Sequence, residues 1–249
     1  MAGPPPDANW IIEPIVEADS VVLFTGDSGA GKSIICASMI LSIVRGEPWC
    51  GYPTTKGRVL YIDNENSARL VDKRLRMLGF TAEDVKSLRY FSRLGVQLGS
   101  GQWLERTLDE VDDFKPSLVV LDTVSSTTTA TANDNDAIAR LYATVLRPLA
   151  SETCAVIAQH HERKPAQGIP VDGRNAALGG VHWRTQADTM MRIERKGDVV
   201  QRGNIRKFSV VVSMPKNRDG ETMHLPLAIC SEHEGKRTLR GWIERREER

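Results

Sequence analysis

The chain has 249 residues, of which 41% are hydrophobic and 26% are charged, an ordinary globular balance that allows one large α/β domain or two small ones. Its formal net charge of +1 excludes a global field that would draw the protein onto nucleic acid or a membrane, so any nucleic-acid contact must come from local basic loops. No apolar run approaches about 18 residues, and we therefore expect no membrane-spanning segment.

The cysteines and the first residues indicate a compartment. Four cysteines are scattered along the chain without a Cys-x-x-Cys pair, which argues against a zinc site and a disulfide scaffold and favours a reducing cytoplasm. Residues 1–6 lack the charged and apolar regions of a signal peptide. We expect a cytoplasmic protein in which residues 1–9 form a short disordered lead-in.

A glycine-rich stretch between a predicted strand (20–25) and a predicted helix (34–45) fits the phosphate-loop pattern of Gly, four residues and then Gly-Lys-Ser. It reads Gly26-Asp27-Ser28-Gly29-Ala30-Gly31-Lys32-Ser33. Glycines let the backbone turn tightly so that successive N–H groups face an anion, and the helix N-terminus adds its partial positive charge. We expect Lys32 to reach the β- and γ-phosphates and the Ser33 hydroxyl to bind Mg²⁺, with Ile34 completing the nucleotide contacts.

Two later strands end in acidic residues. The first, residues 58–63, runs into Asn64-Glu65, and a helix is predicted over 67–78. The second, residues 118–122, is an apolar strand that ends in Asp122, the Walker B signature whose acid holds Mg²⁺ through water. No acid follows Asp122 directly, so Glu65 is the candidate that orients the attacking water and takes its proton. The alternative for Glu65 is a surface helix cap.

A fourth buried strand, residues 154–158, ends in Gln159, His160 and His161. Gln159 and His160 are predicted to touch the γ-phosphate and to relay its presence to the loop that follows. Two adjacent histidines also suggest a metal site, but neighbours on a strand point in opposite directions and no third ligand is evident.

The C-terminal part predicts further strands. Residues 189–194 and 208–214 are strand-like, with a turn at 196–198 between them and a polar turn at 216–220 before a last hairpin. Residues 236–249 mix charges densely, which is typical of a solvated end.

The order of these elements predicts an α/β fold. A strand, a helix and a strand in succession imply parallel strands with right-handed crossovers. Ligands bind at the carboxyl ends of the strands of such sheets. Four strand ends here carry reactive groups: the phosphate loop, the Asp63 and Glu65 pair, Asp122, and the Gln159 segment.

Together these motifs resemble the RecA-like ATPase superfamily, and in particular the hexameric replicative helicases of the plasmid RepA and DnaB type. Glu65 lies where that superfamily places its catalytic glutamate, and Asp122-Thr123 matches the end of its Walker B strand. His160-His161 and the basic residues after them are similar to the RepA sensor and its DNA-facing loop. Lys216-Asn217-Arg218 resembles the Lys/Arg pair that reaches into a neighbouring subunit's ATP.

The resemblance covers about residues 10–226 and implies a RecA-like P-loop core: a mainly parallel sheet flanked by helices, with a C-terminal β-hairpin extension. The implied organisation is a lead-in over 1–9, an ATPase domain over 10–235 and a charged tail over 236–249. ATP and Mg²⁺ are the implied cofactors, and the implied partners are single-stranded DNA and identical subunits in a ring, a hexamer in this family.

Residue roles follow from the same resemblance. The catalytic set comprises Lys32, Glu65, Lys216 and Arg218, the last two acting on a neighbour's nucleotide. The loop after His161 is expected to line a central pore and to touch DNA phosphates through three cations: Arg163, Lys164 and Arg174. ATP is favoured over GTP because residues 216–219 contain the residue types of the guanine-reading Asn-Lys-x-Asp motif in the wrong order.

Four functions compete. The first is a hexameric helicase motor, and the second is a recombination or regulatory ATPase of the RecA or RadA type that does not unwind DNA. The third is a P-loop small-molecule kinase whose lid would be the loop with Arg163 and Arg174. The fourth is a nucleotide-gated interaction module with little turnover. ATPase activity with and without single-stranded DNA, together with oligomeric mass, separates most of them.

Overall fold

The computed structural model describes residues 8–128, 134–162, 181–217 and 220–246. Residues 1–7 of the expected lead-in lie outside this description. The chain begins with a small antiparallel pair, β1 (Trp10–Ile12) and β2 (Val16–Glu17).

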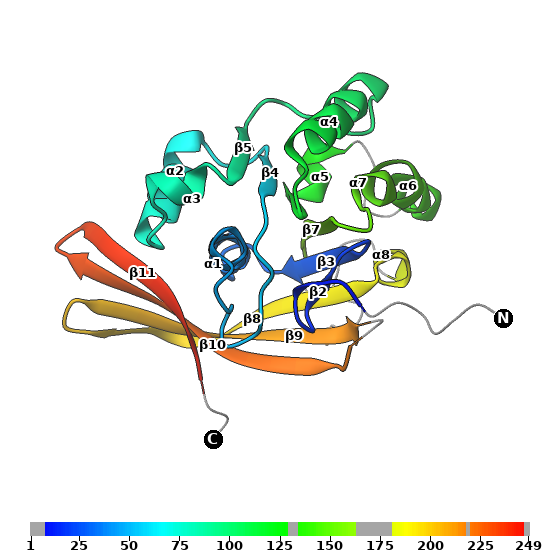
Figure 1. The fold of residues 1–249 in the computed structure, drawn as a ribbon. Coiled ribbons are helices and arrows are strands. Elements are labelled where there is room, and N and C mark those ends of the chain that lie inside the picture. Colours follow the sequence, from blue (N-terminus) through cyan, green and yellow to red (C-terminus); the bar gives the residue numbers. More distant parts are fainter. Residues whose placement is uncertain (1–7, 129–133, 163–180, 218–219, 247–249) are drawn as a thin grey trace.

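A nine-stranded sheet dominates the described part of the molecule (Figure 1). Its strands in chain order are β3 (Val21–Gly26), β4 (Val59–Asp63), β5 (Leu88–Ser92), β6 (Leu118–Asp122), β7 (Ala155–His161), β8 (Thr189–Arg202), β9 (Ile205–Asn217), β10 (Met223–Glu234) and β11 (Arg237–Arg245). In space the order is β11-β10-β9-β8-β3-β7-β6-β4-β5. The strands from β8 to β5 are parallel, whereas β8 to β11 pair antiparallel.

Helices cover both faces of the parallel strands (Figure 1). One face carries α1 (Lys32–Arg45), α2 (Ala68–Met77) and α3 (Ala82–Val85). The other carries α4 (Gly101–Phe114), α5 (Val124–Thr127), α6 (Asn135–Leu141), the π-helical turn η1 (Tyr142–Leu146), α7 (Arg147–Leu149) and α8 (Val181–Gln186). This arrangement confirms the predicted α/β class with a mainly parallel sheet and C-terminal antiparallel strands.

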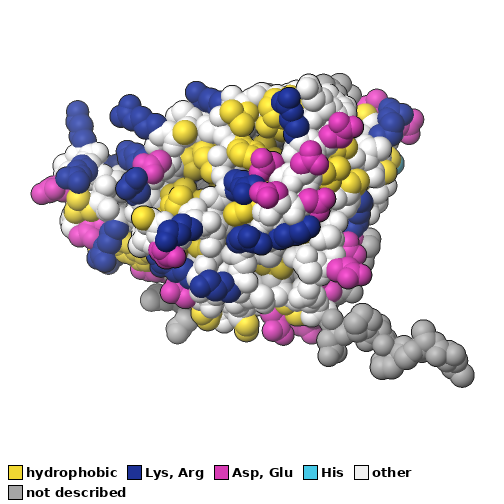
Figure 2. All heavy atoms as spheres, turned by 45° about the horizontal axis from the view of Figure 1, so that its top comes forward, with side chains coloured by type: hydrophobic (Ala, Val, Ile, Leu, Met, Phe, Trp, Pro, Cys, Tyr) yellow, Lys and Arg dark blue, Asp and Glu magenta, His cyan; other side chains and the backbone are white. Residues whose placement is uncertain are grey.

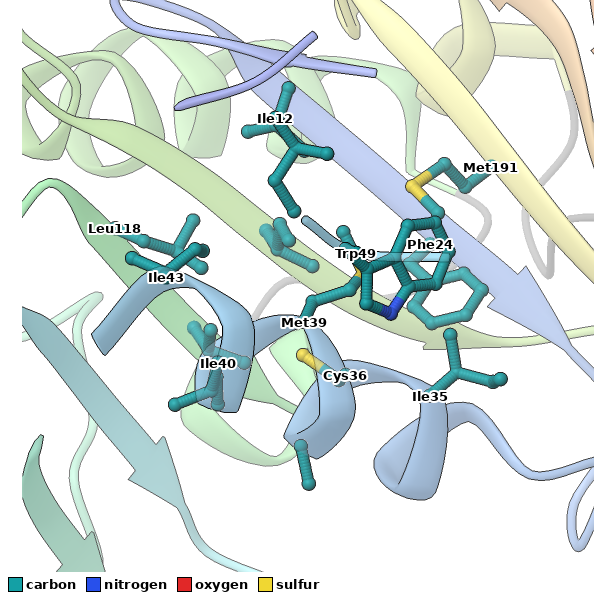
Figure 3. Packing of buried hydrophobic residues seen from close by; sticks show 14 of the residues in the cluster. Ile12, Phe24, Ile35, Cys36, Met39, Ile40, Ile43, Trp49, Leu118 and Met191 are labelled. Atoms are coloured by element: carbon teal, nitrogen blue, oxygen red, sulfur yellow. The ribbon is translucent and has the colours of Figure 1, made fainter. Parts of the chain in front are cut away.

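The strands are apolar along their whole length because both of their faces are covered. Side chains alternate between the faces: Val22 and Phe24 of β3 pack with α1, whereas Val21 and Leu23 pack with α5 to α8. Figure 3 shows the first of these cores, in which Phe24, Met39 and Trp49 lie close together between α1 and the sheet.

The antiparallel strands curl beneath α1, so that β11 contacts both α1 and α2 (Figure 1). Helix α1 therefore lies between the parallel sheet and this C-terminal extension. The consequence for the site is that β9 and β10 approach the N-terminal end of α1, where the phosphate loop is.

The C-terminal extension differs from the sequence prediction in two places. The turn expected at 196–198 lies inside β8, where the register shifts between Lys196 and Val200, and the chain reverses after Arg202 instead. A glycine within a strand commonly marks such a bulge, and Gly197 has a φ of 73°. The sequence pattern does not distinguish this bulge from a turn.

The second difference concerns residues 236–249, expected as a solvated tail. Residues Arg237–Arg245 form β11, which pairs along β10. The dense mixed charge belongs to cross-strand ion pairs: Arg240 contacts Glu232 at 2.6 Å, and Glu244 contacts Lys207 on β9. Opposite charges facing each other across strands stabilise a sheet, so a charge-rich segment here is an edge strand.

On the face shown in Figure 2, Lys and Arg side chains are interspersed with Asp and Glu side chains. This mixture agrees with the small net charge of the chain. Among the described residues, no helix is both long and apolar enough to cross a membrane.

Candidate nucleotide-binding site

The carboxyl ends of the parallel strands bring the predicted groups to one edge of the sheet. Gly26 of β3 is paired with His161 of β7, and Asp63 of β4 is paired with Asp122 of β6. The phosphate loop follows Gly26 directly and leads into α1. Residues that are far apart in the sequence therefore meet here.

The phosphate loop needs glycine at its last turn. Gly31 is the residue before α1 and has a φ of 109°, a conformation that side chains other than glycine rarely adopt. A Cβ atom at this position would lie 2.5 Å from the Cδ1 atom of Ile229 on β10. The backbone conformation of the loop thus requires glycine, and the Ile229 methyl shows how closely the C-terminal extension approaches the loop.

Lys32 lies inside the loop. Its ammonium donates hydrogen bonds to the carbonyl oxygens of Gly26 and Asp27, at 2.6 and 3.0 Å, and the side chain is buried. Burial lowers the pKa of Lys32, while the nearby carboxylates of Asp122, Glu162 and Glu65 act in the opposite direction. A cation in this position is suited to an anionic ligand at the loop.

Ser33 and Asp122 form a direct pair. The Ser33 hydroxyl donates to Oδ2 of Asp122 at 2.9 Å, and the Tyr61 hydroxyl donates to the same oxygen at 2.7 Å. Burial raises the pKa of Asp122, and the charges of Asp63 and Glu65 raise it further, whereas the two hydroxyls oppose this shift. A bound divalent cation would relieve that destabilised carboxylate, so a hydroxyl and an acid in contact fit an Mg²⁺ site.

Asp63 fixes the turn that presents Glu65. Its Oδ1 accepts hydrogen bonds from the backbone N–H groups of Glu65 and Asn66, both at 2.8 Å, and its Oδ2 accepts one from the Tyr90 hydroxyl at 3.2 Å. Asn64 is held as well, because its side-chain amide donates to two carbonyl oxygens at 2.8 Å. The buried Asp63 therefore positions the loop, and the exposed Glu65 projects from it.

Two side chains hold the Glu65 carboxylate. The Thr123 hydroxyl donates to Oε1 of Glu65 at 2.7 Å, and Nε2 of His161 lies 3.6 Å from the same oxygen. The pKa of Glu65 is lowered, and the His161 contact is the largest cause. Burial acts in the opposite direction, and the Thr123 hydrogen bond lowers the pKa further. Glu65 is therefore a carboxylate at neutral pH, the form that accepts a proton.

A cavity of about 350 Å³ joins these groups. Its lining residues are Ser28, Gly29, Gly31, Lys32, Ser33, Ile34, Glu65, Asn66, Arg74, Asp122, His161 and Phe208. They come from the phosphate loop and α1, the Glu65 turn, α2, the ends of β6 and β7, and β9 of the C-terminal extension. A small polar ligand that enters here meets cations, carboxylates and one aromatic ring.

The structure separates the three residues at the end of β7. His161 points to the cavity, where its Nδ1 lies 3.5 Å from the Lys32 ammonium. His160 is on the opposite face of the strand, buried against Trp183 with ring centroids 4.6 Å apart. Gln159 shares the face of His161 but is fully buried beside the Cys36 thiol, and its amide atoms have no oxygen or nitrogen partner among the described residues. Of the three, His161 is the one that lines the cavity.

The remaining predicted residues lie elsewhere. The Lys216 ammonium donates to the carbonyl oxygens of Arg184 at 2.9 Å and Thr185 at 3.2 Å, and also to that of Ala187, so it caps the C-terminal end of α8. A cation at this end of a helix satisfies carbonyl groups that lack a partner. The other cations, Arg163, Lys164, Arg174 and Arg218, lie outside the described residues.

The sequence did not single out four contributors to this site. Tyr61 and Thr123 hold the carboxylates of Asp122 and Glu65, and Thr123 had a signal in its position directly after Asp122. The other two are an ion pair beside the phosphate loop: Arg192 of β8 contacts Glu162 at 2.8 Å. Glu162 also accepts a hydrogen bond from Thr25 at 3.2 Å, which ties β3, β7 and β8 together. No local sequence motif predicts such a pair, because its two residues are 30 positions apart.

Two comparisons with known sequences identify similar proteins. A family model described as AAA domain, AAA_25, matches residues 1–167. A stretch of 116 residues, 47% of this chain, is 31% identical to the DNA repair protein RadA of Mycolicibacterium smegmatis, of which it spans 21%.

Solved structures show the same fold. A KaiC-like protein from the archaeon Pyrococcus horikoshii OT3 superposes with a TM-score of 0.59 at 15% identity, over 87% of this chain and 88% of that protein. The flagellar accessory protein FlaH from Methanocaldococcus jannaschii gives a TM-score of 0.54 at 13% identity, over 86% of each chain. These similarities confirm the RecA-like P-loop ATPase fold, whereas the finer resemblance to RepA and DnaB helicases stays a prediction.

Proposed function

The chain belongs to the AAA domain family AAA_25, and we propose that it hydrolyses ATP with Mg²⁺ at the cavity between the phosphate loop and Glu65. The observation that carries this proposal is the contact of Ser33 with Asp122, at 2.9 Å, beside a buried Lys32. Hydroxyl, carboxylate and ammonium are the three groups that a P-loop uses for a metal-bound triphosphate.

Each group has a role in this proposal. The phosphate-loop amides and Lys32 bind the β- and γ-phosphates, and the Lys32 ammonium exchanges the Gly26 and Asp27 carbonyls for phosphate oxygens. Ser33 and Asp122 would hold Mg²⁺, which would supply positive charge to neutralise the phosphate oxygens. Positioning and charge stabilisation dominate such reactions, since the transferred phosphoryl group needs little covalent help.

Glu65 activates the water. Its carboxylate orients a water molecule in line with the γ-phosphate and takes one proton as the oxygen attacks, and the bond to the β-phosphate oxygen breaks to give ADP and phosphate. Thr123 and His161 keep the carboxylate in place and ionised. His161 also lies beside Lys32, so it is the residue of β7 best placed to respond to the γ-phosphate.

We further propose that turnover is coupled to single-stranded DNA in a cytoplasmic ring of identical subunits. The support is the family-level resemblance of the motifs and three cations after β7: Arg163, Lys164 and Arg174. A hexameric helicase motor is the first form of this proposal. A recombination or regulatory ATPase that does not unwind DNA is the second, favoured by the 31% identity to the DNA repair protein RadA.

Phosphate release with and without a single-stranded oligonucleotide tests the proposal. The parent protein is expected to hydrolyse ATP in the presence of Mg²⁺ and to lose this activity in Lys32→Ala. Lys115→Ala is the matched control, because Lys115 is an exposed lysine whose ammonium pairs with Asp112 at 3.1 Å. Parent-like turnover in Lys32→Ala would refute the site.

DNA coupling has its own measurement. Arg163→Ala/Lys164→Ala/Arg174→Ala is expected to keep basal ATPase but to lose DNA stimulation and to flatten the salt dependence of DNA binding, since each phosphate contact contributes to that slope. Unchanged DNA affinity in this triple variant would contradict the DNA-coupled proposal. Strand displacement on a forked duplex then separates a helicase from the second form.

A further inference from the structure

One cation in the cavity has no role in the proposed chemistry. Arg74, on α2, lines the cavity together with Lys32, Ser33 and Glu65. Its side chain is half-buried, and its Nη1 atom is fully buried with no hydrogen-bond partner among the described residues. A buried N–H donor without an acceptor costs free energy and is rare in native structures, so an acceptor for this group is expected.

The neighbouring arginine on the same helix shows the difference. Arg76 points away from the core, is 76% exposed and pairs with Asp72 at 2.8 Å. The two residues are two positions apart, so they lie on different faces of α2. Only the face with Arg74 meets the cavity.

The acids of the cavity take their hydrogen bonds from donors other than Arg74. Glu65 accepts a hydrogen bond from Thr123, and Asp122 accepts hydrogen bonds from Ser33 and Tyr61. The aromatic ring of Phe208 in the same wall has the Arg195 guanidinium 5.1 Å from its centroid. Since Arg74 lines the cavity and its Nη1 meets no acceptor among the described residues, a ligand oxygen within the cavity suits it as a partner.

We propose that Arg74 binds the phosphate chain of the nucleotide in cis, as a second cation of the same subunit beside Lys32. This inference rests on the proposed ATPase function. A planar guanidinium presents paired donors that match phosphate oxygens, which a single ammonium cannot do. In the structure Lys216, assigned by resemblance to a neighbour's nucleotide, donates instead to carbonyl oxygens around α8.

Calorimetric titration with ATP, ADP and adenosine tests Arg74 directly. Arg74→Ala is expected to weaken ATP binding at least tenfold and to leave adenosine binding unchanged, because adenosine carries no phosphate. Arg74→Lys, which keeps a cation but loses the paired donors, is expected to fall between Arg74→Ala and the parent. Arg76→Ala is the matched control on the same helix and should bind ATP like the parent.

The outcomes separate this inference from the ATPase proposal. Parent-like ATP affinity in Arg74→Ala, with binding lost in Lys32→Ala, overturns the role of Arg74 and leaves the ATPase proposal intact. An equal loss for ATP and adenosine also overturns it, because that result means a collapsed cavity wall. If Arg74→Ala does not fold, as judged by thermal unfolding, Arg74→Lys decides: parent-like ATP affinity in that variant overturns the paired-donor contact. No ATP binding by the parent overturns both.

Discussion

The Thr123 hydroxyl donates a hydrogen bond to Oε1 of Glu65 at 2.7 Å, so the residue directly after β6 holds the carboxylate that follows β4. The two residues are 58 positions apart in the chain. Strand β6, which carries the proposed metal ligand Asp122, therefore also helps to position the proposed base Glu65.

Thr123→Val tests whether this hydrogen bond positions the Glu65 carboxylate. Valine has nearly the same shape as threonine but cannot donate, so the carboxylate loses one of its two partners. Hydrogen bonds to charged groups contribute about 1.5–3 kcal/mol, which corresponds to roughly a tenfold to hundredfold lower kcat if the contact positions Glu65 in the transition state. The affinity for ATP should change little.

Steady-state kinetics of Thr123→Val provide the measurement, with Thr128→Val as the control. Thr128 is another buried threonine after β6, and its hydroxyl donates to the carbonyl oxygen of Val124 and not to Glu65. Equal kcat values for both variants and the parent would show that Thr123 does not position the base.

Glu65→Gln should bind ATP and Mg²⁺ but hydrolyse ATP about 10²–10⁴ times more slowly, since a positioned base contributes that much to the rate. The amide keeps the size of the side chain and its ability to accept from Thr123. Single-turnover hydrolysis separates the chemical step from binding. Full activity in this variant would assign the role of base to another acid.

Acid stability depends on a contact far from the site. Arg45 at the end of α1 binds Asp84 of α3 through two hydrogen bonds, at 2.9 and 2.8 Å, and this guanidinium is the main reason that the pKa of Asp84 is lowered. A carboxylate with a lowered folded-state pKa contributes stability above its unfolded pKa, about 3.9, and loses it as the pH falls toward the folded-state value.

Asp84→Asn should therefore lower the free energy of unfolding at pH 7 by about 1–3 kcal/mol and make the remaining stability less dependent on pH below about 4. Urea unfolding at several pH values gives both quantities. Asp72→Asn is the control, because the Asp72 pair with Arg76 is exposed and such pairs contribute about 0–1 kcal/mol. The same loss in both variants would contradict a special role of the Arg45 contact.

Arg218 is predicted to act on the nucleotide of a neighbouring subunit. A cation supplied in trans adds about 10³–10⁵ to the rate of phosphoryl transfer, so Arg218→Ala alone and Glu65→Gln alone should both be nearly inactive. In mixed rings, some interfaces pair an intact Glu65 site with an intact Arg218, and part of the activity should return. If rings shown by mass to be mixed stay inactive, or if Arg218→Ala is fully active alone, the trans role is wrong.

The sequence by itself determined the fold class and where the ligand-binding edge lies. Apolar runs predicted the parallel strands because both faces of those strands are buried, and the spacing of Gly26 to Ser33 predicted a tight turn before a helix. Asp122 was predicted from the apolar strand that it ends, and Glu65 because no acid follows Asp122; both lie where they can meet because strands of a parallel sheet end at the same edge. These signals are local, or follow from a rule that holds for every such sheet.

The tertiary structure alone decided which side chains meet. It placed His161 rather than His160 in the cavity, because the exact end of β7 sets which residue faces α1, and a one-residue difference reverses the faces. It brought Arg74 and Phe208 to the phosphate loop through the packing of α2 and the curl of β9, neither of which has a sequence signature. It also turned the charged C-terminal segment into a strand, because the partners of those charges lie on β9 and β10, and pairing across strands cannot be read from one strand alone.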